Sequence, residues 1–194
     1  METLLNNPTF IIIAILLVAT YLMYAGIIKK KNKAKEALSG IDVQLKKRSN
    51  LIPNILQIAK KYMEHEKGLL EEITRLRAKV DEGYKSDDSS SIKDYIKQVG
   101  ALDANMGKLM IAVENYPDLK SDQTMLQAMR TYNEVEEQIS AARRFYNSAV
   151  NNLNNAIEIF PGNLIAPLAN AKTMPFYEAD EAARAPVNAS DYLK

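Results

Sequence analysis

Four charged residues interrupt otherwise apolar stripes in this 194-residue chain, and they are its main candidates for chemistry. Arg48 and Glu66 fall in one stripe, and Glu136 and Arg143 in another. An unpaired buried charge costs several kcal/mol, so each must pair or extend to solvent. Either these four residues, here called the polar seam, form an ionic layer that fixes helix register, or their long side chains extend outward. We expect Arg143 to pair with an acid, with Glu136 or Glu66 as the leading candidates.

Other chemistry is poorly represented. His65 is the sole histidine, there is no cysteine, and Leu69 occupies the second ligand's position of an H-E-x-x-H motif. We therefore interpret His65 as a solvated surface residue. The adjacent Glu71 and Glu72 point in different directions on a helix, so they do not form a carboxylate dyad. No phosphate-binding glycine loop or nucleophile elbow is present. These observations predict a non-enzyme with no metal and no cofactor.

The polar seam is positioned by apolar residues at heptad spacing, in steps of three and four. A sustained heptad predicts a long helix in a coiled-coil-like bundle. Because the phase continues past Pro53, we expect one helix from Lys29 to Val80 that is kinked there. The seam positions are Leu38, Ile41, Leu45, Arg48, Ile52, Ile55, Ala59, Tyr62, Glu66, Leu69, Ile73, Leu76 and Val80.

Two further heptads follow a polar loop at 81–91, capped by Ser91 and Ser121 respectively. Pro161 and Gly162 end the last helix, and a short helix with an irregular tail packed on the bundle should follow. The fold class is all-α: an N-terminal transmembrane helix, then a long-helix antiparallel three- or four-helix bundle. The second seam is Ile92, Tyr95, Val99, Leu102, Met106, Leu109, Val113 and Tyr116. The third is Met125, Met129, Tyr132, Glu136, Ile139, Arg143, Tyr146, Val150, Leu153, Ile157 and Phe160.

The stretch from Phe10 to Ile28 is 19 residues without a charge, and as a helix it would span about 28 Å. Its length and its non-basic flank favour a retained span over a cleaved signal peptide. Five lysines follow it and nothing basic precedes it, so the body should face the cytoplasm from the inner or plasma membrane. The expected parts are 1–9 (short extracytoplasmic N-terminus), 10–28 (span), 29–160 (bundle with a juxtamembrane helix) and 161–194 (tail).

The charge distribution favours lipid as a partner. Residues 29–61 carry a net charge of +8, whereas residues 62–194 carry −6. The lysines next to the span could contact anionic lipid headgroups. Nucleic acid is not expected as a partner, because the basic run abuts the bilayer and lacks interleaved aromatic residues.

Two stretches, together with the C-terminus, resemble the LemA family. IDVQLKKRSNLIPNIL (41–56) is similar to its first signature, EVEEQISAARRFYNSAVNNLNNAIEIFPGNLIA (134–166) to its hallmark, and YEADEAARAPV to its ending. Leu153 departs from the pattern, where a second Tyr is usual. The resemblance implies a membrane-anchored helical cytoplasmic body without a known catalytic apparatus. The motif residues in place include Arg48, Pro53, Arg143, Tyr146, Asn147, Phe160 and Pro161.

We expect a non-enzymatic, membrane-anchored scaffold that associates with itself. The alternative is an adaptor or regulator of a membrane enzyme such as a protease or sensor kinase. At 1.5 Å per residue, the second and third helices would not reach the membrane-proximal part of a helix about 78 Å long. A homo-oligomer would bury that part, and the predicted oligomer seam is Leu38, Ile41, Leu45 and Ile52. The monomeric alternative is that the proline-rich tail folds back over these positions.

Overall fold

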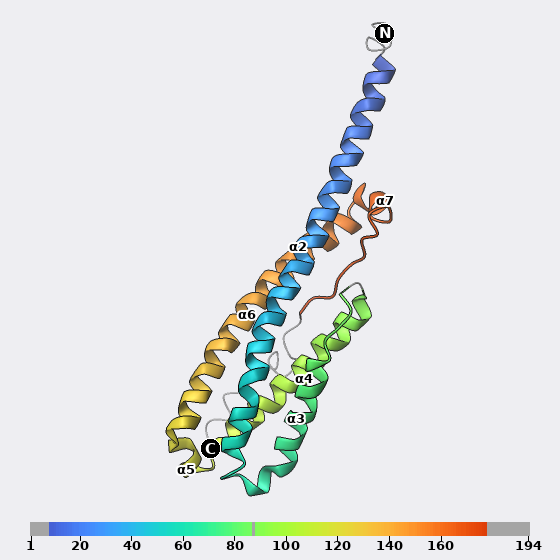
Figure 1. Ribbon diagram of the computed structural model, residues 1–194. Helices are drawn as coiled ribbons and strands as arrows, with labels where there is room; N and C mark the ends of the chain where they lie inside the picture. The colour runs from blue at the N-terminus through green and yellow to red at the C-terminus, as the bar shows by residue number, and fades with distance from the viewer. Residues whose placement is uncertain (1–7, 87, 178–194) are drawn as a thin grey trace, which may run out of the picture.

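The structure is a computed structural model that describes residues 8–86 and 88–177, and within them it is helical without strands. Four long helices run up and down as an antiparallel bundle (Figure 1). They are α2 (Pro8–Ala59), α3 (Lys67–Asp81), α4 (Ser89–Val113) and α6 (Gln123–Glu158). The short elements η1 (Glu64–Glu66), α5 (Pro117–Ser121) and α7 (Gly162–Ile165) lie at the turns and ends. The all-α bundle predicted from the sequence is confirmed, with four long helices.

The N-terminal part of α2 extends beyond the bundle (Figure 1). It is the one segment among the described residues that is long and apolar enough to cross a membrane. Its large side chains from Phe10 to Leu22 are exposed, because no other element packs there. Around Ile27 the helix enters the body, where α6 and α7 pack against it.

The first helix is shorter than its heptad pattern predicts. Pro53 is exposed and lies inside α2, so the chain does pass through this proline as a helix. The helix then ends at Ala59 instead of continuing to Val80, and α3 runs back antiparallel. The reversal occupies residues 60–66, which is seven residues and therefore one heptad. Apolar positions resume in phase on α3, so the spacing alone does not reveal the turn.

The helices α4 and α6, which carry the second and third heptads, agree more closely with their patterns. The α4 seam is buried from Ile92 to Val113, at every predicted position in that range. The caps differ: Asp88 caps α4 and Asp122 caps α6, where Ser91 and Ser121 were expected. Each aspartate accepts a backbone N–H from the first turn of its helix, as an N-cap does.

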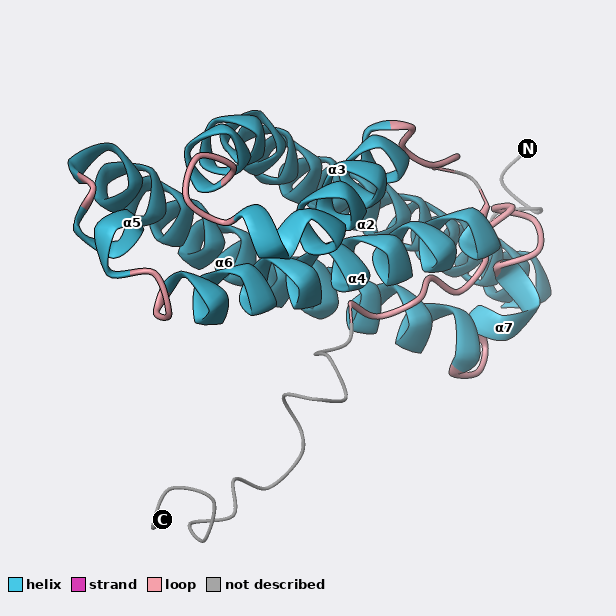
Figure 2. Ribbon diagram, turned by 90° about the horizontal axis from the view of Figure 1, so that it is seen from below, coloured by secondary structure: helices cyan, strands magenta, loops and turns pink. Residues whose placement is uncertain are grey.

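The tail after α7 returns along the bundle and covers the membrane-proximal part of α2 (Figures 1 and 2). Met174 and Tyr177 belong to the same buried cluster as Leu38 and Ile41. All four residues of the predicted oligomer seam are at most 3% exposed within one chain. The expectation of an open seam was therefore wrong, because α6 packs along α2 and the tail residues Met174 and Tyr177 join the same core.

Candidate functional site

The most deeply buried charge is Arg48 on α2, whose side chain is 1% exposed. Its Nη1 contacts Asp103 Oδ1 on α4 and donates to Glu136 Oε1 on α6 at 2.6 Å. Arg143 on α6 donates from Nη2 to the other Asp103 oxygen at 2.7 Å. Two arginines and two carboxylates thus form a neutral group, here called the arginine layer, that joins three helices.

The arginine layer keeps its cations charged despite burial. Burial alone would lower the pKa of Arg48, but the nearby Asp103, Tyr132 and Glu136 raise this pKa above its ordinary value. The pKa of Arg143 is raised in the same way, against burial, chiefly by Asp103. Arg143 also lies over the Tyr177 ring, 4.7 Å from its centroid. Arginines with raised pKa values stay charged at ordinary pH, so the layer is suited to holding helices in register.

A second polar contact joins α2 to α4 and to the loop between α3 and α4. Tyr84 and Tyr95 donate their hydroxyls to the two oxygens of Asp42, at 2.5 and 3.3 Å. Their rings lie 4.8 Å apart. Burial raises the pKa of Asp42, and the two phenol hydrogen bonds oppose that rise. The phenols therefore make a partly buried carboxylate tolerable.

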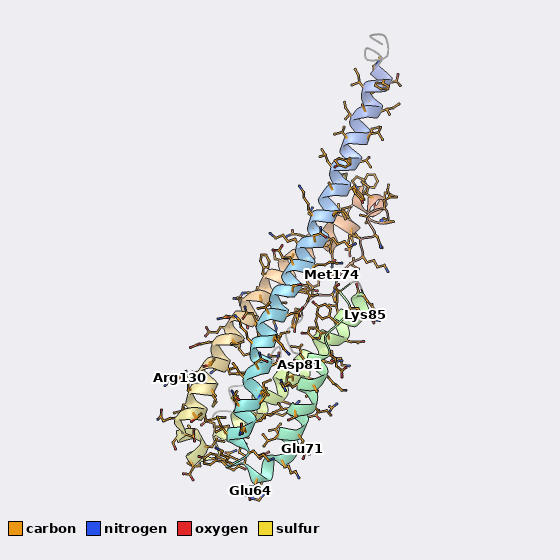
Figure 3. All side chains as sticks on the ribbon, in the orientation of Figure 1. Glu64, Glu71, Asp81, Lys85, Arg130 and Met174 are labelled. Carbon is orange, nitrogen blue, oxygen red and sulfur yellow. The ribbon has the colours of Figure 1, made fainter. Side chains whose placement is uncertain are left out.

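Side chains of α6 fix the tail through its backbone. Asn147 donates to the Tyr177 carbonyl at 2.8 Å and accepts the Tyr177 N–H at 2.7 Å. Asn154, two turns further along α6, makes the same pair of bonds with Met174, each at 3.0 Å. Tyr146 adds a bond from its hydroxyl to the Pro175 carbonyl at 2.8 Å. We call these three residues the tail clamp; Figure 3 labels Met174, one of the clamped residues.

The chemistry available in these groups is limited. No cluster of three His, Asp or Glu residues suited to a metal occurs in the part of the chain that the structure describes. The charged groups of the arginine layer are directed at one another, and the tail clamp binds peptide backbone. Both arrangements suit a structural role.

The sequence matches the profile of the LemA family over residues 37–190. The chain belongs to the LemA family. Among its relatives is Protein LemA of Metamycoplasma hominis, which is 27% identical over 175 residues, covering 88% of this chain and 78% of that protein. Magnetosome protein MamQ 2 of Paramagnetospirillum magneticum is 24% identical over 191 residues, covering 88% and 70%. MamQ of Magnetospirillum gryphiswaldense is 23% identical over the same length. Together with the apolar N-terminal helix, these relatives indicate a membrane protein.

Four of the LemA-type motif residues lie in the structural groups described above. Arg48 and Arg143 belong to motifs far apart in the sequence, yet both contact Asp103. Tyr146 and Asn147 belong to the tail clamp. Pro161 begins the turn into α7, and Phe160 beside it is 74% exposed, although it was expected on the third seam. The ending motif lies outside the described residues after Tyr177.

Two expectations for the polar seam need correction. Arg143 pairs with Asp103, and Glu136 pairs with Arg48 instead. Glu66 lies in η1 at the reversal, outside the arginine layer, because α2 ends before reaching it. Asp103 was missed because it lies beside the seam position Leu102, where a heptad pattern assigns no buried role. The one signal for Asp103 in the sequence is that the two seam arginines need acidic partners.

Proposed function

We propose that this LemA-family protein is a non-catalytic adaptor, held by a single membrane-spanning helix, that binds a segment of another membrane protein. The sequence left self-association and an adaptor role as alternatives. A self-associating stalk needed the open seam at Leu38, Ile41, Leu45 and Ile52, and that seam is buried within one chain. The closed core favours the adaptor.

One observation carries the proposal: a groove of about 830 Å³ at the end of the bundle farthest from the apolar span. It lies between the end of α2 and the start of α3. Leu56, Met63 and Leu70 contribute apolar surface, and Met63 and Leu70 belong to the core. A groove that reaches core residues and has a charged rim suits the apolar face of an amphipathic helix. The rim residues are Lys60, Glu64, Lys67, Glu71 and Arg75.

The proposed topology places this groove in the cytoplasm. Lys29, Lys30 and Lys31 directly follow the apolar stretch, with Lys33 and Lys35 beyond them, so the positive-inside rule retains the body on the cytoplasmic side. A periplasm-active reporter fused after Lys194 should be inactive. Strong reporter activity would reverse this orientation.

Site-specific crosslinking tests the adaptor. A photocrosslinking amino acid at Glu64 should give a discrete heterologous product in native membranes, because Glu64 is on the groove rim (Figure 3). The same amino acid at Arg130, an exposed position on the outer side of α6, is the matched control and should give none. Leu56→Gln should abolish the Glu64 product by making the groove polar. Crosslinks between two copies of this chain, with a multiple of its 21.8 kDa mass in mild detergent, would contradict the adaptor.

A further inference from the structure

We propose that the segment around α7 is a second membrane contact, which embeds in the acyl chains beside α2 and seats the bundle on the bilayer. The segment Ile159–Ala171 is thirteen residues long and has no charged side chain, between Glu158 and Lys172. All of its large apolar residues except Ile165 point outward from the body. Ile159, Phe160, Leu164 and Leu168 are 63%, 74%, 66% and 73% exposed.

The position of α7 gives these side chains a lipid environment. Ile165, Ala166 and Ala169 pack against Ile27, and Met23 joins the same cluster. Ile27 is the next-to-last residue of the apolar stretch, and Met23 lies about 7.5 Å deeper than Ile28 at 1.5 Å per residue. Segments at a membrane interface are buried about 5–10 Å deep. The inference therefore rests on the proposed crossing of the bilayer by α2.

Most backbone N–H groups of the segment are bonded within it. Between Asn163 and Ala171, seven backbone N–H groups donate to carbonyls of residues 159–167. Pro167 has no N–H to satisfy. Hydrocarbon tolerates a polypeptide only when its backbone groups are bonded internally. The exposed side chains of this segment are mainly apolar, with Asn163 and Asn170 as the polar exceptions.

A groove of about 500 Å³ continues the apolar face of the segment onto α2. Leu22, Met23 and Gly26 line it from the apolar stretch, and Phe160 from the segment. Lys30 lies at the end nearer the body, where a bilayer places its headgroups. An acyl chain fits the apolar end of this groove, with the headgroup close to Lys30. Asn152 and Asn155 of α6 line the groove as well. Along α2, the apolar lining residues and then Lys30 follow the order of a lipid's acyl chain and headgroup.

Tryptophan fluorescence of the full-length protein in vesicles tests the contact. The chain has no Trp, so a single introduced Trp is the sole reporter. Leu168→Trp should emit at shorter wavelength and lose at least half its emission in phosphatidylcholine brominated near the carboxyl end of its acyl chains. Ile111→Trp is the matched water-exposed control, since Ile111 is 71% exposed and far along α4 from the span. Leu17→Trp, measured in phosphatidylcholine brominated near the methyl end of its acyl chains, is the control within the span, because Leu17 lies about 16 Å deeper than Ile28.

The outcomes separate the contact from the crossing of the bilayer. If Leu17→Trp is quenched and Leu168→Trp behaves like Ile111→Trp, the α7 contact is wrong and the span stands. If neither Leu17→Trp nor Leu168→Trp is quenched, the span fails as well. A short-wavelength emission of Leu168→Trp that bromine does not quench would mean that protein covers the segment, which also overturns the inference. Helicity measured by circular dichroism confirms that each variant is folded.

Discussion

Replacing Arg48 by Met tests the arginine layer directly. Met keeps an apolar stem of similar length but removes one of the two positive charges. Arg143 still pairs with Asp103 at 2.7 Å, so Glu136 is the carboxylate left uncompensated. Breaking a buried ion pair costs about 3–5 kcal/mol. The side chains of Asp103 and Glu136 are 24% and 29% exposed, and this partial hydration places the expected loss at the lower end.

The assay is thermal unfolding of the full-length protein in mild detergent, followed by circular dichroism. A loss of about 3 kcal/mol lowers the Tm of a body this size by about 6–12 °C. Arg75→Met is the matched control. It removes an arginine from an exposed pair with Glu72, and exposed pairs contribute little to stability, so its Tm should be unchanged.

A second substitution separates the charge effect from packing. Glu136→Gln in the Arg48→Met background returns the layer to one arginine and one carboxylate, Arg143 and Asp103. The double variant should therefore recover a large part of the lost Tm. The pairing would be refuted if the two substitutions lowered Tm additively, or if Arg48→Met alone melted like the wild-type protein.

Three further expectations concern the tail, Asp42 and the entry to α7. Asn147→Asp keeps the acceptor but loses the donor to the Tyr177 carbonyl, so amide hydrogen exchange of residues 171–177 should quicken, whereas Asn151→Asp on the exposed side of α6 should leave it unchanged. Burial raises the pKa of Asp42, so the folded state binds the carboxyl proton more tightly than the unfolded state does. The stability that Asp42 contributes therefore falls as pH rises from the ordinary aspartate pKa through the pKa of the folded state. Asp42→Asn should flatten this part of the Tm–pH curve and cost little at pH 7, because the Asn oxygen still accepts from Tyr84. Gly162→Ala should lower Tm, because its Cβ would lie 2.1 Å from the Ala156 carbonyl oxygen in the backbone of α6, whereas Gly40→Ala meets nothing within 4 Å and should raise Tm slightly.

Heptad spacing predicts which face of a helix is buried, and it does so well where the helix is uninterrupted. On α4 the positions from Ile92 to Val113 are buried as expected. The pattern does not report chain direction, since a reversal of seven residues preserves the phase. Residues 60–66 are such a reversal, and missing it led to a helix that was too long. The expected oligomer seam followed from that length.

The contacts that hold the tail, and the role of Asp103, escaped prediction for a different reason. An extended segment held by side-chain amides needs no apolar period, because its backbone makes the contacts; Met174 and Tyr177 are bound in that way. Asp103 is one residue from the buried stripe, and its role depends on arginines from two other helices. Such groupings arise from tertiary structure, and a single sequence read helix by helix does not contain them.

Four of the LemA-type motif residues stabilise the fold, so variants at these positions report on folding. Arg48, Arg143, Tyr146 and Asn147 are directed at other parts of the same chain, so substituting them tests whether the bundle and its tail form. A loss of function in such variants would follow from a loss of structure. Partner recognition has to use exposed surface, and the groove rim and the α7 segment are the surfaces with suitable chemistry. Variants there that preserve the Tm are the ones whose phenotypes would report on function.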